Sequence, residues 1–259
     1  MKLKIYQIDA FTQQVFGGNP AAVIPLDNWL DDLVLQQIAT ENNLSETAFF
    51  VMKKEFIELR WFTPVAEVNL CGHATLAAGF VIFEELKWST EIISFSTKSG
   101  LLHVRKRKNT FELNFPVDAI EEIDKKTYNN LFNQEPTEVW HGKEDLLFLF
   151  KSEKEVRSLK PNLHKISQVP YRGVIATSIG ENVDFVSRFF TPQLGINEDP
   201  VTGSAHTTLT PFWSKKLNKN NFNAKQISKR GGDLICWLNK NKVHISGHAI
   251  CYLKGEIVI

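Results

Sequence analysis

The chain has 259 residues, enough for one large domain or for two of about 130 residues each. Apolar residues make up 43% and charged residues 23%, which excludes disordered and fibrous classes and predicts a globular protein with a sizeable core. The net charge of +1 gives no electrostatic reason to expect a nucleic acid or an acidic membrane as a partner.

Residues 1–11 alternate charged and apolar side chains, which is typical of a first strand and not of a signal peptide. No run of about 18 apolar residues occurs in the sequence, so no transmembrane helix is expected. The three cysteines, Cys71, Cys236 and Cys251, form no disulfide pattern, and an odd number suits a reducing compartment. We therefore expect a cytoplasmic protein.

The further elements follow in chain order from periodicity and turn signals. An amphipathic helix is predicted at residues 31–42, and the segment after Gly72 is apolar nearly all round, which predicts a helix buried on every side. A second amphipathic helix is expected near residues 145–159, and a helix after Gly203 should be shorter or bent because Pro211 interrupts it. Strands are predicted at residues 91–97, 101–107, 111–116, 233–238, 242–249 and 255–259.

Two similar segments occur in the chain, residues 46–64 in the first half and residues 174–192 in the second. Each contains an apolar strand, a short polar turn and a second strand that ends in Arg-aromatic-Phe-Thr-Pro. Aligned without a gap, the segments place Glu46 opposite Val174. Strand-rich halves that each surround one apolar helix predict an α+β protein with two similar domains, related by a pseudo-twofold axis and with a ligand site in the cleft between them.

A glycine turn opens the expected helix in each half, at Gly72 and at Gly203, if the second half carries three extra residues. A helix N-terminus has unpaired N–H groups and a partial positive charge, so two facing helix starts would hold a carboxylate or a developing enolate. The expected substrate is a small organic acid. The alternative is that both are ordinary helix starts, with Thr75 and Ser204 as capping residues.

Metal and hydrolase chemistry have less support at these turns. Cys71 and His73 could open a metal site, but no second Cys/His pair has a suitable spacing for zinc, so no metal is expected. Ser204, His73 and Asp199 could form a hydrolase triad, but T-G-S-A-H lacks the G-x-S-x-G nucleophile elbow.

Glu46 leads directly into an apolar strand and has no acidic counterpart in the second half. A carboxylate at the head of a buried strand is suited to act as a base, and the alternative is an edge residue that faces water.

Four motifs in order resemble the PhzF-like isomerases, which are named for the phenazine-biosynthesis isomerase and are related to diaminopimelate epimerase. They are AFTQQVFGGNPAAVI, NLSETAFF, RWFTPVAEVNLCGHATLA and EDPVTGSAH, which together extend from about residue 9 to residue 210. The resemblance implies two diaminopimelate-epimerase-like domains, each a barrel-like, mostly antiparallel sheet around a central helix. We expect these domains at residues 1–117 and 118–249, with the last strand, 250–259, completing the first.

The resemblance also implies an isomerase without a cofactor, because the family's phenazine enzyme isomerises a dihydro-hydroxyanthranilate by moving a proton. The Glu of N-L-S-E, here Glu46, is the implied base. The other implied catalytic residues are His73, Asp199 and Ser204, which can orient the substrate and hold developing charge. Expected substrate contacts are Asn19, Cys71, Gly72, Thr202 and Gly203. Members are typically homodimers, so we expect a homodimer, active in biosynthesis.

The sequence departs from the epimerase relatives at one informative position. Those enzymes use two cysteines, one from each domain, whereas here Thr202 lies opposite Cys71. A threonine hydroxyl cannot replace a thiolate base, so the expected chemistry depends on Glu46. Two alternatives stay open: an amino-acid or hydroxy-acid epimerase or racemase that uses Cys71 with another partner, and a non-catalytic protein that binds a small acid.

Overall fold

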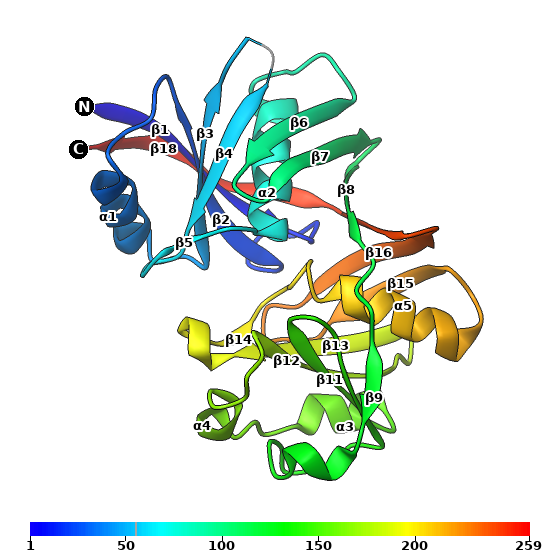
Figure 1. Ribbon diagram of the computed structural model, residues 1–259. Helices are drawn as coiled ribbons and strands as arrows, with labels where there is room; N and C mark the ends of the chain where they lie inside the picture. The colour runs from blue at the N-terminus through cyan, green and yellow to red at the C-terminus, as the bar shows by residue number, and fades with distance from the viewer. Residues whose placement is uncertain (55) are drawn as a thin grey trace. The chain divides into compact units, whose positions relative to one another are not determined.

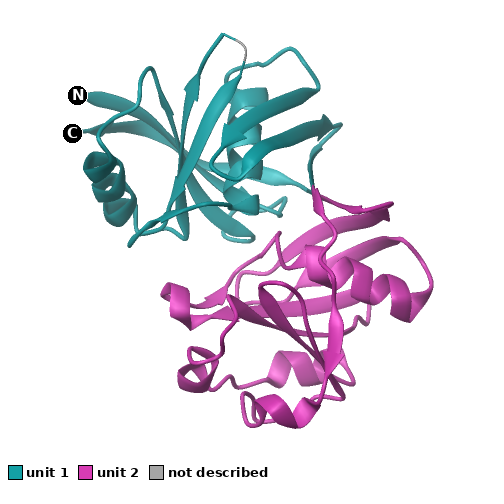
Figure 2. Ribbon diagram, viewed as in Figure 1, with its two compact units in different colours: residues 1–114, 246–259 teal, residues 115–245 magenta. Residues whose placement is uncertain are grey.

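The computed structural model describes residues 1–54 and 56–259. The chain forms two compact units, which Figures 1 and 2 show in the same view. Unit 1 comprises Met1–Asn114 together with Ser246–Ile259, and unit 2 comprises Phe115–Ile245. Among the helices formed by the described residues, none is both long and apolar enough to span a membrane.

Unit 1 consists mainly of strands. They are β1 (Lys2–Ala10), β2 (Asn19–Leu26), β3 (Glu46–Met52), β4 (Ile57–Phe62), β5 (Glu67–Val68), β6 (Ile92–Thr97), β7 (Gly100–Arg107), β8 (Thr110–Pro116), which runs across the unit boundary, and β18 (Ala249–Val258). Its helices are α1 (Asp32–Asn42), α2 (Gly72–Phe80) and the π-helical turn η1 (Val81–Glu85). The predicted helix at 31–42 and the predicted strands of this unit are confirmed.

The last strand of the chain completes the sheet that the first strand begins. β18 pairs antiparallel with β1 from Lys2 to Ala10, and β2 lies on the other side of β1. The amino group of Met1 donates a hydrogen bond to the carbonyl of Ile259, so the two chain ends lie side by side (Figure 1).

The apolar helix α2 is buried inside unit 1, as predicted from its lack of a polar face. Every residue from Gly72 to Gly79 is buried, and the helix contacts β1, β2, β3, β7 and β18. Gly79 permits a close approach to β7, because a Cβ there would lie 2.7 Å from a methyl group of Val104. The position of α2 therefore fixes where its first residues meet the surrounding strands.

Helix α1 covers strands of unit 1 on the side away from α2 (Figure 1). Its buried residues Leu35, Ile38 and Ala39 join a core cluster with Phe49 and Val51 of β3. β3 is therefore buried on both faces, which explains why its sequence is continuously apolar after Thr47.

Unit 2 repeats the strand order of unit 1. Its strands are β9 (Glu121–Ile123), β10 (Glu138–His141), β11 (Asp145–Leu149), β12 (Gly173–Ile179), β13 (Phe185–Thr191), β14 (Ile196–Asp199), β15 (Asn221–Gln226), β16 (Gly232–Asn239) and β17 (Lys242–Gly247), which reaches the unit boundary. Its helices are η2 (Lys125–Tyr128), α3 (Glu153–Ser158), α4 (Leu163–Ile166), η3 (Pro192–Leu194) and α5 (His206–Leu217). β11 and β12 are parallel like β2 and β3, and β12 and β13 are antiparallel like β3 and β4.

The repeated hairpin differs by a single position from the predicted register. The second strands of the two hairpins keep the predicted spacing along the chain, since β4 begins at Ile57 and β13 at Phe185. The first strands do not, because β12 begins at Gly173, one residue before the predicted match of Glu46. The parallel neighbours agree, since Ala21 lies beside Glu46 and Asp145 lies beside Gly173. The prediction that Glu46 corresponds to Val174 is therefore wrong, because an ungapped comparison misses the extra residue in the second turn.

Helix α5 is shorter than the helical segment at the start of which Gly72 lies, as predicted. It runs for 12 residues with Pro211 inside it, whereas α2 and the π-helical turn η1 that continues it run for 14 residues together (9 + 5). Proline cannot donate to the carbonyl of Thr207 four residues earlier. That carbonyl instead accepts a hydrogen bond of 3.3 Å from the Asp118 amide, so its bonding capacity is used despite the proline.

The helix predicted near residues 145–159 is only partly present. Residues 145–149 form the strand β11, and a helix begins only after Ser152, whose hydroxyl accepts from the Glu155 amide. A short run of apolar residues fits a buried strand as well as a helix, and pairing with β10 and β12 decides for the strand here.

Candidate active site

Glu46 and His73 meet in unit 1. Glu46 is the first residue of β3 and His73 the second residue of α2. His73 Nε2 lies 3.1 Å from Glu46 Oε2, and the two side chains are 5% and 13% exposed. The approach misses the direction of a hydrogen bond, so neither atom has a hydrogen-bonded partner among the described residues. Buried polar atoms normally have one, and this pair is therefore a candidate ligand contact.

The other edge of the His73 ring faces Asn19 and Cys71. Nδ1 lies 3.2 Å from Asn19 Nδ2 and 3.5 Å from Cys71 Sγ. In the neutral ring, the Asn19 amide donates to Nδ1 and the Nε2 proton faces Glu46. In the protonated ring, the Nδ1 proton requires an acceptor, which the sulfur or a turned Asn19 amide can supply.

Neighbouring groups favour the charged form of His73. Burial lowers the pKa of His73, but the negative charges that Cys71 and Glu46 can carry outweigh it and hold the pKa well above 6.5. Burial also raises the pKa of the Cys71 thiol. The imidazolium of His73 is therefore stabilised by the negative charge of its neighbours, of which Glu46 is the one that faces Nε2.

Among the described residues, no side chain caps the start of α2. The Thr75 hydroxyl donates to the carbonyl of Cys71 at 2.5 Å and does not accept from a backbone N–H. The alternative that Thr75 caps this helix is therefore wrong. The helix start keeps a partial positive charge next to Glu46 and His73, which favours an anion there.

The loop before Asn19 has an unusual backbone. Phe11 and Phe16 have φ angles of 63° and 73°, a region that bulky residues rarely adopt. The Phe16 amide donates to Asp9 Oδ2 at 2.9 Å, which helps to hold this conformation. Strained backbone is concentrated at functional sites. Asp9 and this loop, which leads to Asn19, therefore add support for a site in this part of unit 1.

Glu46 supplies a third possible metal ligand beside Cys71 and His73. One ligand atom from each of the three lies within 4.8 Å of the others, so the structure adds a carboxylate to the Cys71–His73 pair but no second Cys/His pair among the described residues. However, Cys71 contacts Nδ1 and Glu46 contacts Nε2, at opposite edges of the ring. A single ion would have to bind one ring nitrogen, so the site would need to rearrange.

Two other acidic residues near the turns are used in a repeated Arg–Glu pair. Arg60 donates to both carboxylate oxygens of Glu67 at 2.8 and 2.9 Å, and Arg188 donates to Glu198 at 2.7 and 2.8 Å. The Arg60 hydrogen bond lowers the pKa of Glu67 to about 2, although burial opposes this. Glu67 and Glu198 therefore have structural partners in their own units.

In unit 2, Asp199 is held by a small buried network. Asp199 ends β14, and the Thr202 hydroxyl donates to its carboxylate. Gln226 on β15 donates to the Asp199 carbonyl and accepts from the Thr202 amide, both at 2.8 Å. Thr202 thus orients Asp199. Gln226 could not be identified from the sequence, because it lies on a later strand of the chain and stands in no motif.

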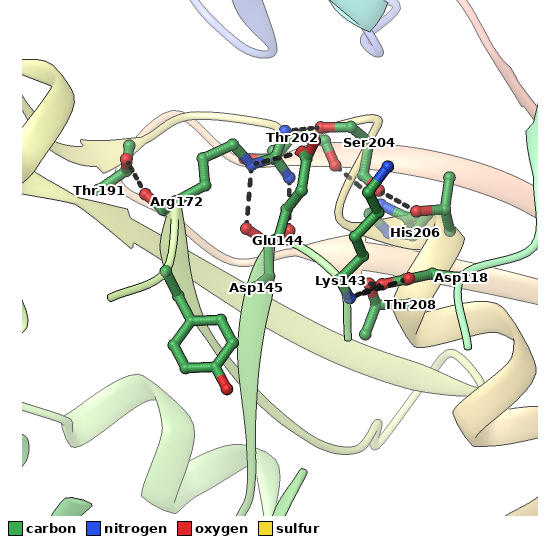
Figure 3. Close-up of polar contacts among 12 residues, drawn as sticks. Asp118, Lys143, Glu144, Asp145, Arg172, Thr191, Thr202, Ser204, His206 and Thr208 are labelled. Carbon is green, nitrogen blue, oxygen red and sulfur yellow. Dashed lines mark hydrogen bonds and ion pairs between the residues drawn. The ribbon is translucent and has the colours of Figure 1, made fainter. Parts of the chain in front are cut away.

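Ser204 contacts Arg172, a second residue that no sequence motif indicated (Figure 3). Arg172 Nη1 donates to Ser204 Oγ at 2.8 Å, while Nε donates to Asp145 at 2.9 Å and Nη2 donates to the other Asp145 oxygen. Asp145 is 2% exposed and is the parallel neighbour of Gly173. The sequence signal for this contact was an acidic residue at the start of one apolar strand, Asp145, and an arginine directly before the next apolar strand, Arg172.

The segment from Gly203 to Ala205 forms a turn ahead of α5. The amide of His206 donates to the Gly203 carbonyl at 3.0 Å, and no side chain caps the helix. Ser204 is therefore not a capping residue. The amides of Gly203, Ser204 and Ala205 donate to no acceptor within the described part of the chain, so they can bind an anion.

His206 is fully buried in unit 2 and differs from His73. Burial lowers the pKa of His206 to about 4, because the contacts with the Thr202 and Gly203 carbonyls compensate only in part. Nδ1 lies 3.0 Å from the Thr202 carbonyl and donates to it, which makes Nε2 the unprotonated nitrogen. His206 therefore supports the turn as a neutral side chain.

The sequence-predicted residues fall into two groups, one in each unit. Glu46, His73, Cys71, Gly72 and Asn19 lie together in unit 1. Thr202, Gly203 and Ser204 follow Asp199 closely in unit 2. Each group lies at the start of its unit's buried helix.

Comparison with known proteins identifies relatives over the full length. Residues 8–255 match the PhzC-PhzF family, described as phenazine biosynthesis-like protein. An uncharacterized isomerase of Pseudomonas aeruginosa is 45% identical, over 99% of both chains. A crystal structure of a phenazine biosynthesis protein of the PhzF family from Enterococcus faecalis is 44% identical, with a TM-score of 0.97 over 100% of both chains.

A more distant structure shares only the fold. The crystal structure of a hydroxyproline epimerase from Agrobacterium vitis is 10% identical, with a TM-score of 0.64 over 99% of this chain and 92% of the epimerase. Together with the sheet-dominated units, this likeness confirms the expected α+β, diaminopimelate-epimerase-like fold.

Proposed function

This chain belongs to the PhzC-PhzF family and is an isomerase, and on that basis we propose that it moves a proton on a small carboxylic acid, with Glu46 as general acid and base. The substrate is cyclic or unsaturated, since the electron pair left after proton removal must be delocalised. The contact between Glu46 Oε2 and His73 Nε2, two buried atoms without hydrogen-bonded partners among the described residues, is the observation that carries the proposal.

In the proposed reaction, Glu46 accepts a proton from a carbon of the substrate. The C–H electron pair shifts into the conjugated system, a double bond moves, and the protonated Glu46 returns the proton to another carbon. No atom or electron is gained overall, so the reaction as written needs no cofactor. The imidazolium of His73 holds Glu46 in place and offers positive charge where negative charge develops.

Unit 2 offers groups that are suited to bind an acid group. The Ser204 hydroxyl and the unpaired amides before α5 offer donors to an oxyanion, and Asp199 orients the substrate or receives a hydrogen bond from it. The support is that the described residues leave the amides of Gly203, Ser204 and Ala205 without an acceptor.

The alternative with Cys71 as the base has less support. Burial raises the pKa of the Cys71 thiol, and Thr202, which stands where a second cysteine would be, donates its hydroxyl to Asp199. A thiol that remains protonated is a poor base near neutral pH.

The test is proton exchange with solvent. Candidate acids, including dihydro-hydroxyanthranilate and cyclohexenecarboxylate, are incubated in D2O with the wild type, Glu46→Gln and Cys71→Ser, and deuterium uptake is followed by NMR. The proposal predicts uptake with the wild type and Cys71→Ser and its loss in Glu46→Gln. Loss in Cys71→Ser with uptake in Glu46→Gln would support an epimerase, and tight binding without any exchange would support a binding protein.

A further inference from the structure

Arg172 makes a contact that the proposed chemistry has not used. Its Nε and Nη2 groups are occupied by the buried carboxylate of Asp145, while Nη1 donates to Ser204 Oγ at 2.8 Å (Figure 3). Because a bidentate carboxylate already occupies one edge of the guanidinium, that edge cannot also take the acid group of a substrate.

The contact determines what the Ser204 hydroxyl can do. A guanidinium only donates hydrogen bonds, so Ser204 Oγ must act as acceptor toward Arg172. The hydroxyl proton then points elsewhere, and no group in the described part of the chain accepts it. The positive charge of Arg172 also polarises the O–H bond and makes the hydroxyl a better donor.

Arg172 is held firmly enough to act in this way. Its carbonyl accepts from Thr191 Oγ1 at 2.7 Å and from the Gln193 amide group, and its guanidinium lies 5.4 Å from the centre of the Phe189 ring. Asp145 fixes the plane of the guanidinium from β11. Backbone and side chain are therefore both restrained before any ligand binds, which reduces the cost of ordering the donor.

We infer that Arg172 is a positioning residue that fixes the Ser204 hydroxyl as a preset hydrogen-bond donor to an oxyanion of the substrate, a carboxylate or an enolate. The inference rests on the proposed function for the choice of ligand. It assigns Arg172 a role through Ser204 and no contact with the substrate.

A double-mutant cycle tests whether Arg172 acts through Ser204. Benzoate, crotonate and cyclohexenecarboxylate serve as probes, and binding is followed by the amide NMR shifts of Gly203, Ser204 and Ala205 in the full-length protein. We expect Arg172→Lys and Ser204→Ala each to weaken binding about tenfold. In the Ser204→Ala background, Arg172→Lys should change the affinity by less than about twofold. Arg172→Gln, if it folds, should behave like Arg172→Lys.

Arg188 provides the matched control. It also pairs with a carboxylate through two hydrogen bonds and lies 4.9 Å from a phenylalanine ring centre, that of Phe190, but its guanidinium bonds to Glu198 and to backbone carbonyls. Arg188→Lys should leave probe affinity unchanged. A purely structural role for Arg172 would instead lower the melting temperature and weaken binding equally in both Ser204 backgrounds.

Two results would overturn the inference. One is an additive effect of Arg172→Lys and Ser204→Ala, and the other is the absence of amide shifts with every probe in the wild type. Failure of the proposed function is a separate result, because it would appear as a lack of deuterium uptake while the cycle still shows coupling.

Discussion

His73 is the residue through which the unit 1 groups influence one another. Its Nε2 faces Glu46, and its Nδ1 faces Asn19 and Cys71. Because burial alone would lower the pKa of this imidazole, the raised pKa depends on the neighbouring negative charge. Removing that charge should therefore convert His73 from a charged to a neutral residue near pH 7.

We predict that Glu46→Gln lowers the pKa of His73, as measured by the pH dependence of its ring nitrogen shifts in NMR. For a pKa that folding raises above 6.5, the associated stabilisation is complete below pH 6.5 and is lost as pH rises through the folded-state pKa. Glu46→Gln should therefore reduce stability most below pH 6.5. An unchanged His73 titration in the variant would contradict the assignment of Glu46 as its counterion.

Gly173 shows why the second copy of the repeat has no carboxylate at the position of Glu46. A Cβ at this position would lie 2.3 Å from a ring atom of Phe189. We predict that Gly173→Ala destabilises the protein by about 1–3 kcal/mol in denaturant unfolding, because the rigid ring cannot move aside easily. Gly255→Ala is the control, since its nearest neighbour lies at 3.9 Å, and it should change stability by less than about 0.5 kcal/mol. Equal effects of the two variants would refute this explanation.

The Arg–Glu pairs connect elements within each unit. Arg60 on β4 holds Glu67 on β5, just before the start of α2, and Arg188 on β13 holds Glu198 on β14. Each pair links the second strand of the repeated hairpin to the short strand that follows it. The repeated Arg in the sequence indicated the hairpin, but its acidic partner could be assigned only from the structure.

We predict an acid-dependent effect for Glu67→Gln. Because Arg60 lowers the pKa of Glu67 to about 2, the pair stabilises the fold fully above about pH 4.5 and is lost as the pH falls toward 2. The variant should lose about 2 kcal/mol of unfolding free energy at pH 7 and little at pH 2, measured by urea unfolding.

Glu256→Gln is the control for that experiment, because Glu256 meets Lys2 at 3.6 Å with both side chains more than half exposed. Exposed pairs contribute little, so this variant should resemble the wild type at both pH values. If Glu67→Gln lost as much unfolding free energy at pH 2 as at pH 7, the charge of Glu67 would not be the cause of the loss.

Sequence patterns predicted most elements because turn residues and alternation mark the strands clearly. They failed where pairing with other strands determines the secondary structure. The short apolar run at residues 145–149 suits a helix or a strand, and it forms a strand. The patterns also do not show how α5 continues past Pro211, because the Asp118 amide that bonds to the Thr207 carbonyl lies far away in the sequence. Local rules identify an unmet carbonyl but not the distant group that satisfies it.

At the scale of the whole molecule, the internal repeat was the most informative sequence feature. It predicted two similar units, and the strand order of β2–β3–β4 does recur in β11–β12–β13. Comparing the two copies of the repeat also indicated the motif residues of the candidate site. It did not indicate Arg172, Asp145 and Gln226, because their roles depend on contacts between segments that are far apart in the sequence.

The family resemblance leads us to propose a homodimer in solution. Sedimentation equilibrium should then give a mass of about 59 kDa, twice the chain mass of 29.6 kDa (2 × 29.6 = 59.2). A mass near that of a single chain at micromolar concentration would contradict this prediction.

The central claim is that Glu46 carries the proton, and the rate of solvent deuterium incorporation tests it most directly. With an acid that the wild type exchanges in D2O, Glu46→Gln should be slower by at least about 100-fold while remaining folded. Glu41→Gln, a change of the same chemistry at an exposed position on α1, should exchange at the wild-type rate. Incorporation by Glu46→Gln at the wild-type rate would contradict the account.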